Sequence, residues 1–267
     1  MYFMGVDLAW SDRNTTAVAV AEGDGLEASL YTYKEDLQSD QDIADFIDQC
    51  VGSTPALVAI DAPLKVPNEA GSRPVERRIT EVFGQFEAGA FPANRSRWAR
   101  RGQEVRGERM VQCLAEKGFI HSPRIQKREQ RRLVFEIYPH PAMVSLFHLE
   151  KTLKYKGRRG RSYERRYEEF KRYQEYLRDL ANSKPKLAPD EEVLGEEVSG
   201  LRGKGLKTYE DLLDAMFCAY IAYYVWYWGP KRYEIFGDEH HGYILVPMTP
   251  WMRAQLYNSS RSHLVQE

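Results

Sequence analysis

The chain has 267 residues, 43% of them hydrophobic, which suits one domain of ordinary core size or a domain with a large insertion. Its formal net charge of −1 at pH 7 excludes a general electrostatic attraction to nucleic acid, so any basic surface must be local. The sequence lacks a signal-peptide pattern, a long uncharged apolar run and closely spaced cysteines, which predicts a cytoplasmic protein with no membrane contact.

The first predicted element is a strand over residues 2–10, an apolar run that contains one carboxylate, Asp7. Apolar strands of this kind are usually buried on both faces at the centre of a sheet. A carboxylate there costs free energy unless it is paired or binds a metal. Residues 15–21 and 26–33 predict two more strands, joined by the hairpin signal Gly23-Asp24-Gly25, so that the three strands form an antiparallel meander.

A helix is predicted after the meander, followed by a buried strand that ends at a second acid. Ser39 is a favourable N-cap, apolar residues follow it at helical spacing, and Gly52 marks the end of the helix. Residues 56–60 predict the fourth strand. Because Pro63 cannot continue a strand ladder, Asp61 stands at the carboxyl end of this strand.

The fifth strand and the last long helix carry further acids in apolar surroundings. Residues 133–138 predict a strand that contains Glu136, a residue type disfavoured in central strands. Residues 209–228 predict a long, largely apolar helix with Asp211 and Asp214 near its start. Asp214 is a candidate for the same site as the earlier acids, whereas Asp211 is better explained as first-turn compensation of the helix dipole.

Two segments predict helical insertions in a single domain that spans residues 1–267. Residues from about 65 to 130 are rich in loops and arginine, and residues from about 151 to 207 are highly charged. The basic runs at 95–109 and 156–166 fit contacts with nucleic-acid phosphates. The glutamates interleaved with the second run fit a solvated, salt-bridged face equally well.

Four of the acids lie in short motifs that follow one another on three strands and the closing helix. The motifs are Gly5-Val6-Asp7-Leu8-Ala9, Ile60-Asp61-Ala62-Pro63-Leu64, Phe135-Glu136-Ile137-Tyr138-Pro139-His140 and Asp214-Ala215-Met216-Phe217-Cys218-Ala219. Together they resemble the ribonuclease-H-like superfamily and, more closely, the domain of unknown function 429, a family of predicted nucleases. The resemblance implies an α/β fold with a mixed five-stranded sheet of order 3-2-1-4-5, flanked by helices, and a charged helical insertion.

The resemblance also implies the chemistry of the site. The four acids would be catalytic and would bind two divalent ions, Mg²⁺ or Mn²⁺, because these cations prefer oxygen ligands. Asp7 would bridge both ions, Asp61 and Glu136 would each complete one site, and Asp214 would complete the second. Two such ions can activate a water and stabilise the leaving oxygen of a phosphodiester, which implies a nuclease.

The candidate substrate contacts near these motifs are Lys65, Arg77, Arg78 and His140. Lys65 would contact a phosphate just after Asp61, although a solvated lysine is the commoner role. His140 is either a water-orienting group or a structural histidine. Residues 74–78, which include both arginines, depart from the acid-bearing helix that the family implies, so substrate choice stays open.

Two alternatives to the nuclease remain open on the sequence. An actin-like ATPase or phosphotransferase has the same core fold, but the turn after Asp7 has Ala9 and Trp10 in place of the glycine that approaches phosphate. A non-catalytic binding protein is the other alternative, although such a protein has no physical reason to keep a buried cluster of like charges. Nucleic acid, DNA or RNA, is the expected partner, and the sequence predicts no oligomeric state.

Overall fold

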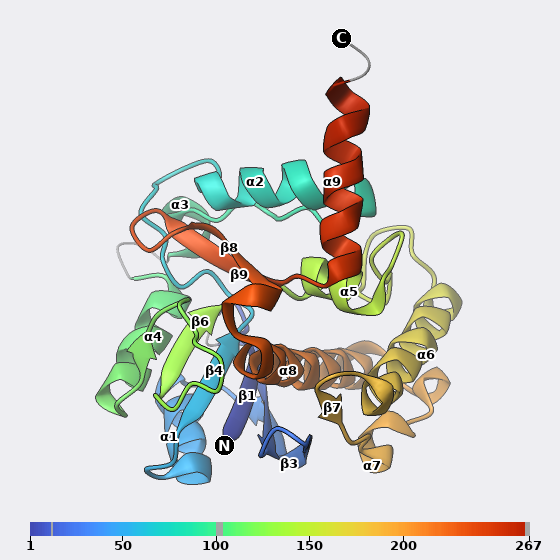
Figure 1. The fold of residues 1–267 in the computed structure, drawn as a ribbon. Helices are drawn as coiled ribbons and strands as arrows, with labels where there is room; N and C mark the ends of the chain where they lie inside the picture. The colour runs from blue at the N-terminus through green and yellow to red at the C-terminus, as the bar shows by residue number, and fades with distance from the viewer. Residues whose placement is uncertain (12, 100–103, 265–267) are drawn as a thin grey trace.

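The structure is a computed structural model that describes residues 1–11, 13–99 and 104–264 (Figure 1). It has a mixed α/β architecture in which helices flank a central sheet. Among the described residues this sheet has seven strands, in the order β5-β6-β4-β1-β2-β3-β7. In chain order the strands are β1 (Tyr2–Asp7), β2 (Thr16–Gly23), β3 (Glu27–Leu37), β4 (Ala56–Ile60), β5 (Ile120–His121), β6 (Leu133–Glu136) and β7 (Lys186–Leu187).

The sheet is mixed and mostly parallel. The strands β1, β2 and β3 pair antiparallel, which confirms the predicted meander, whereas β4, β5, β6 and β7 pair parallel to their neighbours. The observed sheet differs from the predicted five-stranded order 3-2-1-4-5, because β5 and β7 extend it at the two edges. Both come from segments predicted as helical insertions, and strands of two residues leave no periodic signal in a sequence.

Helices and a separate hairpin make up the rest of the described chain. The predicted helix after the meander is confirmed, with the Ser39 hydroxyl accepting a hydrogen bond from the Asp42 amide and Gly52 at the C-cap. No helix in the described part of the chain is both long enough and apolar enough to cross a membrane. The remaining elements are α1 (Asp40–Val51), α2 (Pro74–Phe83), η1 (Gly84–Phe86), α3 (Arg95–Trp98), α4 (Arg106–Glu116), α5 (Pro139–Phe147), α6 (Tyr163–Asp179), η2 (Leu180–Asn182), α7 (Glu191–Leu194), η3 (Val198–Gly200), α8 (Gly203–Trp228), η4 (Gly229–Arg232), β8 (Tyr233–Asp238), β9 (Gly242–Pro247) and α9 (Pro250–Leu264).

The two faces of the sheet carry different helices. Side chains alternate along a strand, so Phe3 of β1 and Leu57 of β4 pack on the face covered by α8. Met4 and Val58 pack on the other face, with residues of α1 and α4. Asp7 follows Phe3 by four residues, and Asp61 follows Leu57 by four. Because this number is even, both aspartates lie on the face covered by α8.

A glycine in β1 lets α8 approach the sheet closely. A β-carbon on Gly5 would lie 1.9 Å from the Ala215 carbonyl oxygen and 2.6 Å from the Cys218 β-carbon, so only glycine fits at this position. The backbone of α8 therefore crosses β1 two residues before Asp7. This crossing brings the acids of α8 to the carboxyl end of β1.

Candidate active site

A cleft of about 640 Å³ opens at the carboxyl ends of β1 and β4. These strands are adjacent and parallel, so Asp7 and Asp61 lie at the same edge of the sheet, where the Asp61 amide donates a hydrogen bond to the Val6 carbonyl at 2.9 Å. Both carboxylates line the cleft. Open α/β sheets place their ligands at this edge. Glu136 lines the cleft as well, so the structure brings three of the four predicted acids to it.

Asp211 also lines the cleft and is 8% exposed. Its carboxylate lies near that of Asp7, and its negative charge raises the pKa of Asp7. The prediction that Asp211 compensates the dipole in the first turn is wrong, because α8 begins at Gly203, two turns earlier than the sequence predicts. A lone carboxylate near a helix start carries no signal that separates the two roles.

The aspartates of the cleft are held in surroundings that oppose their ionisation. Burial raises the pKa of Asp7 well above its usual range; Lys156 opposes this rise, and Asp214 and Asp211 add to it. Burial likewise raises the pKa of Asp61, again opposed by Lys156 and reinforced by Asp7. Burial also raises the pKa of Asp211. Burial is thus the largest cause that opposes the ionisation of these acids.

Asp214 does not line the cleft, and it is fully buried beneath it. Its Oδ1 accepts hydrogen bonds from the hydroxyls of Tyr155, at 2.6 Å, and Tyr173, at 3.2 Å. The Nζ of Lys156 lies 2.8 Å from Oδ2. This second contact is an ion pair without hydrogen-bond alignment, since Oδ2 has no hydrogen-bond partner. Asp214 therefore anchors Lys156 rather than facing a substrate.

Two lysines supply positive charge to the aspartates. Burial by itself would lower the pKa of Lys156, but Asp214, Asp7 and Asp61 together raise it well above its usual range. Lys207, one turn before Asp211 on α8, forms an ion pair with that carboxylate. Sequence reasoning missed both lysines. Lys156 begins a run of basic residues in a segment predicted as an insertion, and nothing in the run marks which side chain turns inward.

Glu136, the third predicted metal ligand, is held by an arginine. It lines the cleft, but in the sheet register it pairs with Ile60, so its side chain leaves the strand on the face opposite Asp61. There Arg73, which is 1% exposed, donates to both of its oxygens at 2.6 and 3.0 Å, and the Leu64 amide donates to Oε2 at 2.8 Å. Burial raises the pKa of Glu136, and Arg73 opposes that rise. Glu136 is therefore committed to Arg73.

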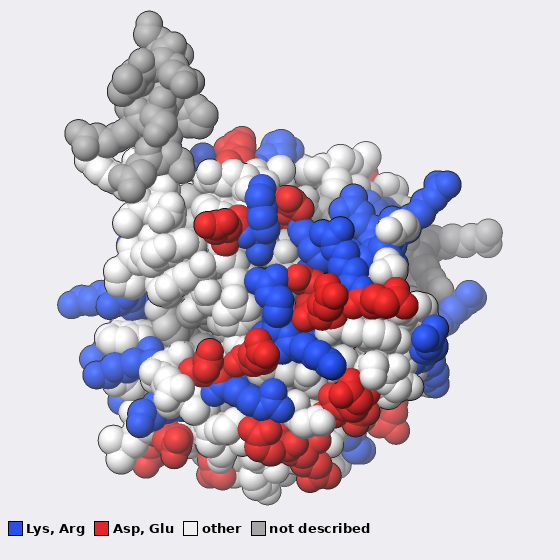
Figure 2. All heavy atoms as spheres, turned by 90° about the vertical axis from the view of Figure 1, so that its right-hand side faces the viewer, with Lys and Arg blue, Asp and Glu red and all other residues white. Residues whose placement is uncertain are grey.

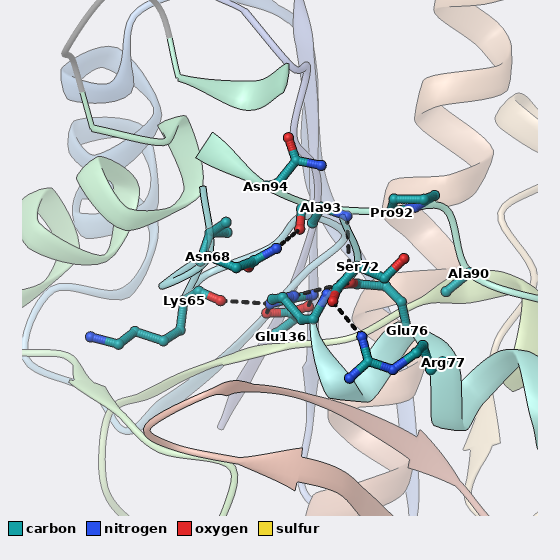
Figure 3. A network of polar contacts seen from close by, with 12 residues as sticks. Lys65, Asn68, Ser72, Glu76, Arg77, Ala90, Pro92, Ala93, Asn94 and Glu136 are labelled. Carbon is teal, nitrogen blue, oxygen red and sulfur yellow. Dashed lines mark hydrogen bonds and ion pairs between the residues drawn. The ribbon is translucent and has the colours of Figure 1, made fainter. Parts of the chain in front are cut away.

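The arginine that binds Glu136 belongs to a wider network of loop contacts (Figure 3). The Arg73 guanidinium also contacts Glu76 at 2.5 Å and the Lys65 carbonyl at 2.8 Å. Through these bonds Arg73 ties the loop after β4 to the start of α2 and the end of β6. Its burial and four acceptors indicate a structural role for the network.

Three of the predicted substrate contacts lie outside the cleft. Lys65 is exposed, and its side chain points away from the network in Figure 3. Arg77 is exposed and donates to the Ser72 carbonyl at 2.7 Å. Arg78 is exposed and forms an ion pair with Glu81 at 3.1 Å. The structure does not bring these three cations to the aspartates.

His140, the fourth predicted contact, does line the cleft. Its Nδ1 lies 3.0 Å from the Thr152 hydroxyl. Burial, followed by the charge of Lys156, lowers the pKa of His140 to about 3. The imidazole is therefore neutral at pH 7, which fits both the structural and the water-orienting roles considered from the sequence.

The first basic run is largely paired in the described structure, whereas in the second run ion pairs join Lys156 to Asp214 and Arg166 to Glu210. In the first run Arg95 contacts Glu108, while Arg106 and Arg109 both contact Asp40; Arg100 and Arg101 lie outside the described residues. Figure 2 shows positive and negative side chains interleaved on the face that carries α6. The ion pairs of α6 include Arg172 with Glu169 and Arg178 with Glu191. This face has no single sign of charge.

The donor set of the cleft fits a hard divalent cation. Asp7, Asp61 and Asp211 offer only oxygen atoms, the ligands that Mg²⁺ and Mn²⁺ prefer. Among the described residues, no group of three or more His, Cys, Asp or Glu side chains already has the arrangement of a metal site. Lys156 provides positive charge to these aspartates.

Comparison with known proteins adds one match. A sequence model of one protein family, described as Protein of unknown function (DUF429), matches residues 5–240. This range includes the three aspartates of the cleft and both lysines that neutralise them. No curated protein matches the chain.

Proposed function

The chain belongs to the DUF429 family, and on that basis we propose that it is a ribonuclease-H-like, metal-dependent nuclease that hydrolyses phosphodiester bonds in the cleft. The observation that carries the proposal is the convergence of Asp7, Asp61 and Asp211 in an open cleft, where burial opposes the ionisation of Asp7 and Asp61. Two features support the superfamily assignment. The sheet has an antiparallel meander followed by the parallel strands β4 and β6, and acids lie at the ends of β1 and β4.

In this proposal Asp7, Asp61 and Asp211 would hold Mg²⁺ or Mn²⁺. Bound there, the metal would supply activation of a water and stabilisation of the leaving oxygen. Asp211 takes the role that the sequence assigned to Asp214, since Asp211 reaches the cleft and Asp214 does not. Glu136 acts indirectly, by holding Arg73 and the loop that follows Asp61.

The lysine and the histidine of the cleft have roles that follow from their charge states. Lys156 stays protonated, so its Nζ can donate hydrogen bonds to a phosphate oxygen while Asp214 holds the side chain in place. His140 is neutral at pH 7 and a weak base, so it can orient a water but does not remove its proton.

An actin-like phosphotransferase is less well supported by the turn after β1. In actin-like proteins free backbone amides of this turn approach the nucleotide phosphates. Here the Ala9 amide donates to the Thr16 hydroxyl at 3.1 Å, and the Ala9 carbonyl accepts from Arg106 at 2.8 Å. The turn is thus held by protein contacts.

The proposal is tested by a cleavage assay on single-stranded, duplex, hybrid and branched DNA and RNA, with Mg²⁺, with Mn²⁺ and with EDTA. We expect metal-dependent cleavage that falls by at least about 100-fold in Asp7→Asn and in Asp211→Asn, because each change removes a negatively charged oxygen from the donor set. Glu81→Gln, an exposed acid on α2, is the matched control and should leave cleavage unchanged.

Direct metal binding separates an inactive enzyme from a wrong assignment. Titration with Mn²⁺, followed by electron paramagnetic resonance, should show saturable binding in the wild type and in Glu81→Gln, and weaker binding in both aspartate variants. Equal binding in Asp7→Asn and the wild type would contradict the metal site. Cleavage at full rate in EDTA would contradict the proposed chemistry.

A further inference from the structure

Besides Tyr138, three aromatic side chains line the same cleft as the aspartates: Trp10, Phe91 and Trp98. Trp10 follows β1 directly, Trp98 ends the short helix α3, and Phe91 lies on the loop between η1 and α3. The ring centroids of Trp10 and Trp98 are 4.5 Å apart at an interplanar angle of 46°. We call these three side chains the aromatic rim.

The aromatic rim is anchored from below and open above. The Trp98 indole donates to the Pro92 carbonyl at 3.2 Å and packs on a small cluster formed by Val66, Ala93 and Val105. In contrast, Trp10 is 57% exposed and Phe91 is 64% exposed. Exposed apolar rings gathered at one cleft form a patch of the kind that marks a ligand-binding groove. The anchoring of Trp98 keeps the rim in position beside the cleft.

Positive side chains accompany the rim. The Arg97 guanidinium carbon lies 5.9 Å from the Trp10 ring centroid, and Arg13 and Lys204 line the cleft. Both Arg13 and Lys204 are exposed. Aromatic faces beside exposed cations are the combination that proteins use to bind unpaired bases and the phosphates between them.

We propose that the aromatic rim stacks an unpaired nucleobase, so that the substrate of the cleft is single-stranded nucleic acid. This inference rests on the proposed function, since it places the base beside the phosphate over Asp7, Asp61 and Asp211. A base within a duplex has both faces covered by its neighbours, so it cannot stack on Trp10 or Phe91 without leaving the helix. A cleft of about 640 Å³ has the size of a small-ligand site.

The test measures binding in EDTA, where metal-dependent hydrolysis cannot proceed. Fluorescence anisotropy would compare a labelled single-stranded oligonucleotide, its duplex, and an abasic oligonucleotide of the same length. We expect the single strand to bind best and Trp10→Ala to weaken its binding about 10-fold, the loss of one base stack. Trp10→Phe should retain most of the affinity. Binding of the abasic strand should be weak and insensitive to Trp10→Ala.

A matched control and a small competitor sharpen the result. Tyr31 on β3 is 56% exposed and lies outside the cleft, so Tyr31→Ala should bind all three ligands as the wild type does. Competition by nucleoside monophosphates at low concentration would identify a free nucleotide as the source of the base. Competition by single strands alone would identify nucleic acid.

Several outcomes would overturn the inference: equal affinity for normal and abasic strands, equal affinity for single strand and duplex, unchanged binding in Trp10→Ala, or no binding by the wild type. The proposed function fails separately. If base-dependent binding is lost in Trp10→Ala but no metal supports cleavage, the rim binds bases and the nuclease proposal is wrong. If the enzyme cleaves and Trp10→Ala leaves the KM unchanged, only the rim assignment is wrong.

Discussion

Replacing Lys156 with methionine tests whether this lysine neutralises the acids that would otherwise bind a metal. Methionine keeps much of the apolar stem and removes the charge. At 2.8 Å from Asp214 Oδ2, the Coulomb attraction is about 6 kcal/mol for an effective dielectric constant of about 20. Desolvation and the 31% exposure of the lysine side chain offset part of this attraction. Because Asp214 is fully buried, we expect Lys156→Met to lower the free energy of unfolding by about 3 kcal/mol in EDTA.

The assay is urea unfolding of the wild type and Lys156→Met, in EDTA and with Mn²⁺. Without the competing ammonium, Mn²⁺ should bind the aspartates more tightly, so it should stabilise the variant more than the wild type. A concentration of 100 times the Kd would add about 2.7 kcal/mol. Lys204→Met is the control, because Lys204 lines the same cleft but is exposed.

Two results would refute this reasoning. If Lys156→Met is as stable as the wild type in EDTA, Lys156 does not compensate the buried charge of Asp214. If the variant is less stable but Mn²⁺ stabilises it no more than it stabilises the wild type, the aspartates do not bind the metal in place of the lysine. A gain equal to that of Lys204→Met would point to nonspecific ion binding.

Two further predictions concern Glu136 and His140. Glu136→Gln leaves Arg73 buried without its main counter-charge, so the free energy of unfolding, measured in urea, should fall by about 3 kcal/mol. The Mn²⁺ affinity should stay unchanged. A large loss of Mn²⁺ affinity at unchanged stability would instead make Glu136 a metal ligand. The folded-state pKa of His140, about 3, lies below the ordinary value near 6.5. The unfolded chain therefore takes up the proton first, and stability should fall by up to about 1.4 kcal/mol per pH unit below pH 6.5. In His140→Gln this part of the pH dependence should disappear, and equal slopes in both proteins would show that His140 is protonated in the folded state.

The sequence correctly indicated which strands carry acids but not which acids meet. Asp7 and Asp61 could be found because each ends an apolar strand, and the strands proved to be adjacent and parallel. Glu136 ends a similar strand and lines the same cleft, but its register with Ile60 turns its side chain to the other face of the sheet, where Arg73 binds both of its oxygens. Register depends on how strands pair, and a strand sequence alone does not contain its partner.

The choice between Asp211 and Asp214 depended on the packing of α8. The two residues are three positions apart on one helix, so both are compatible with one face. The close approach permitted by Gly5 and the two tyrosines that bind Asp214 direct Asp211 to the cleft and Asp214 beneath it. These contacts come from segments far apart in the chain.

By itself the sequence determined the local features: the meander, the cap at Ser39, the buried strands and the acids at the ends of β1 and β4. Hydrophobic periodicity, turn residues and capping depend on neighbours in the chain, so they can be read without a structure. Only the tertiary structure decided that Lys156 turns inward to the aspartates, that Arg73 binds Glu136, and that an aromatic rim borders the cleft. Charge compensation and cleft formation join residues distant in sequence, and their energies exist only once the chain has packed.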